Sequence, residues 1–192
     1  KFKKLMKKNQ TLNELCKYLL SYDFSNYLLE TLLKNNIAFG VPNRKKTYIR
    51  KIYDLIKKIL PGFFLKPKEI INIVVEFSSI PINEGYLKPH SDGRNKLASI
   101  VIPIVDSEWK SEFCGGTNLL EPKDEKNVFN IINKTLEFNE TNILKVVEFN
   151  KNQMLVFPKT YNSLHSVGPL KGDSKNYYRK SITMNIEKKI IF

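Results

Sequence analysis

The spacing of apolar residues changes near residue 70 of the chain. Before that point, apolar side chains recur every three or four positions, as on one face of a helix. Helices are therefore predicted within residues 11–60. The first begins at a capping box formed by Thr11 and Glu14, the second begins near Ser25, and the third covers residues 49–60.

Beyond residue 70, apolar residues alternate with polar ones or form short apolar runs, which is typical of β-strands. The predicted strands are residues 71–77, 86–92, 97–104, 117–120, 128–132, 136–138, 143–149, 153–157 and 177–186. The strands 143–149 and 153–157 are expected to form a hairpin around Asn150-Lys151-Asn152.

Many short strands after a helical segment indicate a mainly β protein with N-terminal helices, in the α+β class. Two sheets that close on each other, as in jelly rolls and cupins, would leave few exposed edges. A length of 192 residues fits a single domain, residues 1–192. We expect residues 1–65 to form helical support and residues 66–192 to form the β core.

Composition narrows the possible partners and the compartment. The net charge is +13, but 28 of the 32 basic residues are Lys and only four are Arg, whereas base and phosphate readers favour Arg. We therefore expect no specific nucleic-acid partner, and no membrane partner because no apolar run reaches the ~18–20 residues of a span.

Cys16 and Cys114 are too few for a disulfide framework and fit a reducing cytoplasm. The chain begins at Lys1 rather than Met, so a preceding segment stays an open alternative.

Candidate chemistry lies in Lys88-Pro89-His90-Ser91-Asp92, at the end of a predicted strand. Residues i and i+2 of a strand point to the same face, so His90 and Asp92 project together and offer two metal ligands. His165 is the only other histidine of the chain and therefore the candidate third ligand. Arg179, in an Arg-x-Ser sequence, follows fourteen residues later. The alternative is that both histidines are structural and that Arg179 forms a surface ion pair.

The order His-x-Asp, distant His, Arg-x-Ser resembles the iron(II)/2-oxoglutarate-dependent dioxygenases over roughly residues 70–190. Trp109 with Gly115-Gly116, followed by an apolar strand, loosely resembles the prolyl-hydroxylase-like branch of that superfamily. The resemblance implies a double-stranded β-helix (jelly-roll or cupin-like) core buttressed by helices. It also implies that His90, Asp92 and His165 are catalytic ligands of Fe(II), with 2-oxoglutarate and O₂ as cosubstrates and ascorbate as a candidate additional cofactor.

The same resemblance assigns residues to 2-oxoglutarate. Arg179 would hold the distal carboxylate through its two-pronged guanidinium, and Ser181, on the same strand face, would donate a second hydrogen bond. Tyr86 shares a face with His90 and would either line the cofactor pocket or pack. Lys171 and Lys180 are alternative partners for the carboxylate.

The function implied is oxidative decarboxylation of 2-oxoglutarate to succinate, coupled to hydroxylation of a peptidyl side chain or a small metabolite. Asp92 favours hydroxylation, because relatives that halogenate carry a small residue at this position. Two alternatives remain open: an oxygenase that demethylates or hydroxylates nucleic acid, and a catalytically silent cupin-like metal-binding module. The sequence leaves the substrate and the oligomeric state open.

Overall fold

The computed structural model describes residues 6, 8–37, 68–130 and 133–191, and the third predicted helix lies outside them. The chain divides into two compact units, with the main boundaries between Asn72 and Ile73 and between Glu187 and Lys188. One unit contains the helices, and the other contains nearly all of the strands. The expectation of a single domain with helices supporting the core stays a prediction.

Two helices are described, and their N-terminal caps differ from the predicted ones. Helix α2 spans Gln10–Leu19 and helix α3 spans Tyr22–Lys34. The side chain of Asn9 accepts a hydrogen bond from a backbone N–H of the first turn of α2, so the capping box predicted at Thr11 is wrong. Ser21 caps α3 in the same way, four residues before the predicted start. No described helix is long and apolar enough to cross a membrane.

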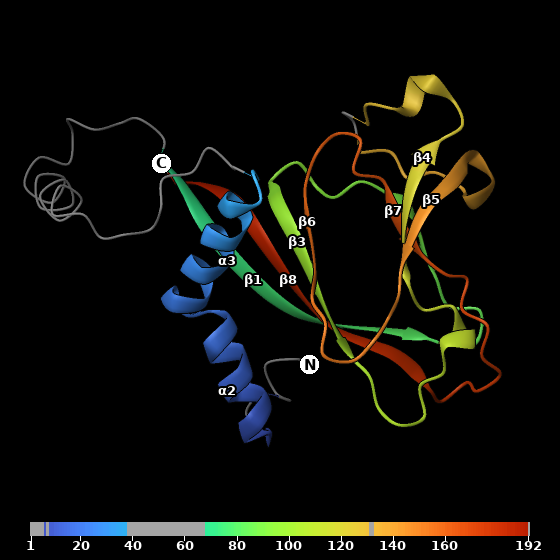
Figure 1. Cartoon of the computed structure of the whole chain (residues 1–192), viewed down its shortest axis with the longest axis horizontal. Coiled ribbons are helices and arrows are strands. Elements are labelled where there is room, and N and C mark those ends of the chain that lie inside the picture. The colour runs from blue at the N-terminus through green and yellow to red at the C-terminus, as the bar shows by residue number, and fades with distance from the viewer. Residues whose placement is uncertain (1–5, 7, 38–67, 131–132, 192) are drawn as a thin grey trace, which may run out of the picture. The chain divides into compact units, whose positions relative to one another are not determined.

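In the described part of the chain, eight strands form two four-stranded sheets (Figure 1). The first sheet has the order β1-β8-β3-β6, with β1 at Lys68–Pro81, β8 at Tyr178–Ile191, β3 at Lys96–Ile104 and β6 at Leu155–Pro158. The second has the order β2-β7-β4-β5, with β2 at Leu87–His90, β7 at His165–Val167, β4 at Thr117–Pro122 and β5 at Thr141–Val147. Strands from the two halves of the sequence interleave in both sheets, which is the arrangement of a double-stranded β-helix. The predicted fold class is confirmed.

The chain between β4 and β6 departs from the prediction. β5 pairs with β4 and β6 pairs with β3, so residues 148–154 cross from one sheet to the other and the predicted hairpin is wrong. The short strands predicted at 128–132 and 136–138 are also wrong for their described residues. That region instead carries irregular chain and two 3-10 turns, Glu125–Asn127 and Phe138–Glu140.

The pair β3–β8 has one apolar face and one polar face. Its apolar face carries side chains that are at most 2% exposed, namely Ala98, Ile100, Ile182, Met184 and Ile186. The other face carries the buried polar residues Ser99, Ser181 and Asn185. Ser99 lies opposite Asn185 and Pro103 lies opposite Ser181 in the antiparallel register. Ser99 on this face donates to Asp92, which follows β2, and Arg179 donates to Gly115, which precedes β4. The polar face therefore lies towards the second sheet.

Candidate metal centre

The two histidines face each other across a strand pair. His90 is the last residue of β2 and His165 is the first residue of β7, and the antiparallel register places them directly opposite each other. Their ring centroids are 4.4 Å apart. Asp92 follows two residues after His90, just beyond the end of the strand.

The three predicted ligands come together at this point. One ligand atom of each residue, a ring nitrogen or a carboxylate oxygen, lies within 4.8 Å of those of the other two. Asp92 and His165 are each only 6% exposed, whereas His90 is half-buried. Residues 75 positions apart in sequence therefore form one compact set of potential metal ligands.

Backbone carbonyls fix which nitrogen of each ring can bind a metal. Nδ1 of His90 lies 2.8 Å from the carbonyl oxygen of Lys88, and Nδ1 of His165 lies 3.0 Å from that of Ser163. A carbonyl oxygen can only accept a hydrogen bond, so each Nδ1 carries the proton and donates. The lone pair of each neutral ring is then on Nε2, and the second nitrogen is held by an outer partner, as is usual for metal-binding histidines.

Asp92 is a buried carboxylate with hydrogen bonds to both of its oxygens. Oδ1 accepts from the ammonium of Lys96 at 2.7 Å, and Oδ2 accepts from the hydroxyl of Ser99. Burial raises the pKa of Asp92, but the hydrogen bonds from Lys96 and Ser99, with the nearby charges, outweigh it and leave the pKa below its usual value. The ligand is therefore ionised at neutral pH.

Ser99 also links the carboxylate to β8. Its hydroxyl also lies 3.2 Å from Oδ1 of Asn185, so its single proton is shared between Oδ2 of Asp92 and this amide oxygen. Ser99 therefore connects the carboxylate to Asn185 on β8.

His165 is held neutral by its surroundings. Burial, together with the neighbouring ring of His90, lowers its pKa to about 4, against the opposing effects of the Ser163 carbonyl and of Asp92. The ring of Phe157 packs edge-on against it, with centroids 4.6 Å apart. His165 thus has its ligand form at physiological pH without having to lose a proton.

Arg179 lies further along the polar face of β8 and is 3% exposed. Its Nε donates to the carbonyl of Gly115 at 2.7 Å, and its guanidinium carbon lies 4.1 Å from the centroid of the Phe149 ring. Burial lowers its pKa to about 10, so it stays charged at neutral pH. Among the residues that the structure describes, no carboxylate lies within ion-pair distance of it.

The other predicted cofactor residues occupy different places. Ser181 is buried on the same face of β8 as Arg179. Tyr86 directly precedes β2 and is 51% exposed, its ring packs edge-to-face on Phe138, and its predicted role stays a prediction. Of the two alternative cations, Lys180 lies 3.8 Å from Asp106 and Lys171 is exposed.

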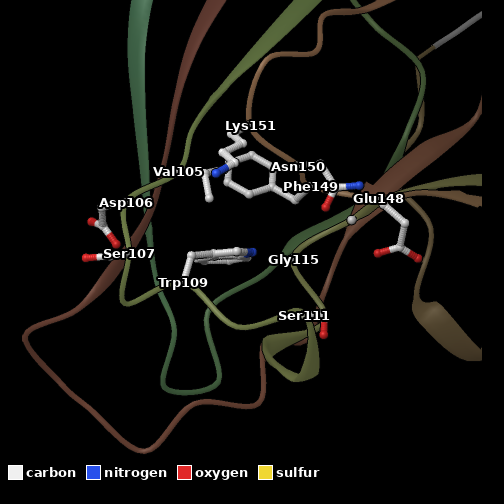
Figure 2. A pocket seen from close by; sticks show the side chains of 11 residues that line it. Val105, Asp106, Ser107, Trp109, Ser111, Gly115, Glu148, Phe149, Asn150 and Lys151 are labelled. Atoms are coloured by element: carbon white, nitrogen blue, oxygen red, sulfur yellow. The ribbon is translucent and has the colours of Figure 1, made fainter.

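A cavity of about 480 Å³ lies beside the end of β3 (Figure 2), and two of its lining residues, Gly115 and Phe149, contact Arg179. Its residues follow the end of β3, precede β4 and follow β5: Val105, Asp106, Ser107, Trp109, Ser111, Gly115, Gly116, Glu148, Phe149, Asn150 and Lys151. None of the three ligands lines it. A Cβ on Gly115 would lie 2.4 Å from the Trp109 indole, which explains the pairing of this glycine with the only Trp.

Residues around the ligands were missed by the sequence analysis. Ser99 donates to Asp92 and contacts Asn185, Lys96 pairs with Asp92, and Lys159 interacts electrostatically with the same carboxylate. The one usable signal was Ser99, a hydroxyl in the otherwise apolar run 97–104. The positions of Asn185 and Lys159 near the carboxylate depend on which strands pair.

No family model and no curated protein matches this sequence. Solved structures similar to the chain include two prolyl hydroxylases. A Trichoplax adhaerens prolyl hydroxylase, solved with a peptide fragment of the hypoxia inducible factor oxygen degradation domain, shares 16% identity over 73% of this chain and 55% of its own, with a TM-score of 0.40. A Pseudomonas putida prolyl-4-hydroxylase shares 16% identity over 90% and 82%, with a TM-score of 0.39. The chain thus spans about half the length of the first of them.

Proposed function

We propose that this protein is an Fe(II)/2-oxoglutarate-dependent dioxygenase that hydroxylates its substrate. The observation that carries the proposal is the set of His90, Asp92 and His165, whose ligand atoms lie within 4.8 Å of one another. Two imidazoles and one carboxylate, with the remaining positions open, are the ligand set of non-haem Fe(II) oxygenases.

The donor set fits the metal in chemistry as well as in number. Both rings have Nε2 free because Nδ1 donates to a backbone carbonyl, and Asp92 is ionised. When bound, Fe(II) would activate O₂, so that 2-oxoglutarate is converted to succinate and CO₂ while one oxygen atom enters a C–H bond of the substrate. The protein's part is to hold the ligands, orient both substrates and exclude water.

The inner face of β8 supports 2-oxoglutarate as the cosubstrate. From Asn185, beside the metal ligands, this face continues through Thr183 and Ser181 to Arg179, and it is polar along its length. Arg179 is a buried cation that would pair with the distal carboxylate of 2-oxoglutarate, and Ser181 would donate a further hydrogen bond. A buried charge without an ion-pair partner among the described residues is costly, and such a ligand would relieve that cost.

The substrate is proposed to be a peptidyl side chain or a small metabolite. Asp92 favours hydroxylation because it occupies the ligand position that a halide would need. A silent metal-binding module would keep the three ligands but form no product, so formation of succinate separates these two functions.

The test is Fe(II)-dependent formation of succinate from 2-oxoglutarate, assayed with pools of peptides and of metabolites. We expect succinate with Fe(II) and none after chelation. Arg179→Ala should weaken 2-oxoglutarate binding by roughly ten- to hundred-fold, because a hydrogen bond to a charged group contributes about 1.5–3 kcal/mol. Arg179→Lys should restore only part of it. Unchanged 2-oxoglutarate affinity in Arg179→Ala would move this role to Lys171 or Lys180, and no succinate under any condition would favour the silent module.

A further inference from the structure

A second cation, Lys159, points to the same end of the core as the metal ligands. Lys159 directly follows β6, and its backbone N–H donates to the carbonyl of Leu97 at 2.8 Å, which holds it against the start of β3. Phe157, two residues earlier, packs its ring on His165. Residues i and i+2 of extended chain share a face, so the Lys159 side chain projects to the side of His165.

Electrostatics agree with this placement. Burial lowers the pKa of Lys159, and the charge of Asp92 raises it, so the ammonium and the metal-ligand carboxylate interact. The ring centroid of Tyr161 lies 5.7 Å from the Lys159 ammonium. Among the described residues, no carboxylate lies within ion-pair distance of Lys159, although it is partly buried.

Lys96, the other lysine near Asp92, already has an ion-pair partner. Its ammonium lies 2.7 Å from Oδ1 of Asp92, so its charge is paired with that of the carboxylate. Lys159 approaches the same carboxylate without reaching it. Of these two lysines beside Asp92, Lys159 is the one with an ammonium available to a ligand.

The sum of the charges around the metal site indicates which kind of ligand Lys159 would bind. Asp92 contributes one negative charge, against two positive charges from a divalent metal and one each from Lys96, Lys159 and Arg179. A dianionic cosubstrate would still leave an excess of two positive charges in a partly buried site, where a charge without a partner is costly. An incoming anionic group would reduce that excess.

We propose that Lys159 is a specificity-determining residue that receives an anionic group, a carboxylate or a phosphate, of the substrate hydroxylated at this centre. The inference rests on the proposed function, since it names the chemical class of substrate for the same site. It predicts that acidic substrates bind in preference to neutral isosteres.

The experiment uses three fluorescent peptide pools that differ only at the positions flanking a randomised centre, which carry glutamate, phosphoserine or glutamine. Binding to the full chain, loaded with Fe(II) and 2-oxoglutarate without O₂, is followed by anisotropy at about 150 mM salt, where surface charges are screened beyond about 8 Å. We expect the wild type to prefer one or both anionic pools over the glutamine pool. Comparison of the glutamate and phosphoserine pools identifies the carboxylate or the phosphate as the source.

Two variants make the result specific. Lys159→Met should weaken binding of the preferred anionic pool by about ten- to hundred-fold and leave the glutamine pool unchanged. Lys151→Met removes an exposed lysine at the opposite end of the core and should change neither. Because binding is measured without turnover, its outcome is separate from that of the succinate assay.

Three results would overturn the proposal. The first is equal wild-type affinity for all three pools, or no binding of any of them. The second is an anionic preference that Lys159→Met retains. The third is loss of 2-oxoglutarate affinity in Lys159→Met, which would assign this lysine to the cosubstrate instead.

Discussion

At the scale of single residues, burial sets the protonation state of the centre. His165 has a pKa of about 4 in the folded protein, below its ordinary value of 6.5. Between these two values the unfolded chain binds a proton that the folded chain does not. Stability should therefore be lost as the pH falls from 6.5 towards 4, and this residue contributes nothing to the pH dependence above that window.

The first prediction concerns the pH dependence of stability that His165 causes. The shift of its pKa from 6.5 to about 4 corresponds to about 3 kcal/mol of unfolding free energy, lost as the pH approaches 4. We expect metal-free His165→Asn to lose less stability than the wild type between about pH 6.5 and 4. Urea unfolding in the presence of a chelator measures it. Identical pH slopes for the two proteins would show that His165 titrates normally.

The second prediction concerns Ser99. Ser99→Ala removes the donor to Oδ2 of Asp92 and the link between this carboxylate and Asn185, so we expect a metal affinity about 10–100-fold lower, the usual cost of losing an outer partner. Ser99→Thr keeps the hydroxyl and should retain most of the affinity, and Ser107→Ala, at the distant cavity, serves as control. Competition with a chromophoric chelator measures the affinity. A wild-type metal affinity in Ser99→Ala would show that Ser99 does not support the metal site.

The sequence allowed prediction of the candidate site only where local geometry was enough. The i,i+2 spacing of His90 and Asp92 is a local property of a strand, and His165 was the only other histidine. That these three side chains come together required a fold, and the structure supplies it. Lys159 could not be found because its position depends on pairing β6 with β3, a contact between residues about 60 positions apart in sequence.

At the scale of elements, the two helix caps give a matched test. Asn9 accepts the hydrogen bond of the first turn of α2, whereas Thr11 lies within the helix and is exposed. Asn9→Ala should lower the unfolding free energy by about 1 kcal/mol, and Thr11→Ala should change it by less than about 0.5 kcal/mol. Chemical denaturation with helix content as the signal measures both. The opposite ranking would restore the capping box predicted from the sequence.

Most strand positions were predictable from local pattern, apart from the two wrong strands at 128–132 and 136–138 and the unpredicted β7, but strand partners were not. The predicted strands 71–77, 86–92, 97–104 and 177–186 correspond to β1, β2, β3 and β8. The short polar segment after β5 resembles a hairpin turn, yet the unpaired edge of β3 accepts β6 and the chain crosses to the other sheet. Local periodicity is the same in both arrangements, so it does not distinguish a hairpin from a crossing.

At the scale of the whole molecule, the net charge of +13 raises the question of nucleic acid. Attraction of a lysine-rich protein to polyanions is expected without sequence preference, and it should fade as salt rises. We predict that single- and double-stranded oligonucleotides do not stimulate succinate formation near physiological ionic strength. Peptides or metabolites should stimulate it, with about 16 Da added to the product. Robust turnover with oligonucleotides and none with the other pools would reverse the assignment.

The central claim is that His90, Asp92 and His165 hold one Fe(II) ion. The measurement is an anaerobic Fe(II) titration of the wild type and of three variants, His90→Ala, Asp92→Ala and His165→Ala, with Asp106→Ala as a carboxylate control at the opposite end of the core. We predict one ion per chain for the wild type and for the control, and nearly abolished binding in each ligand variant, because each removes one of three donors. Wild-type Fe(II) affinity in all three ligand variants would contradict the account.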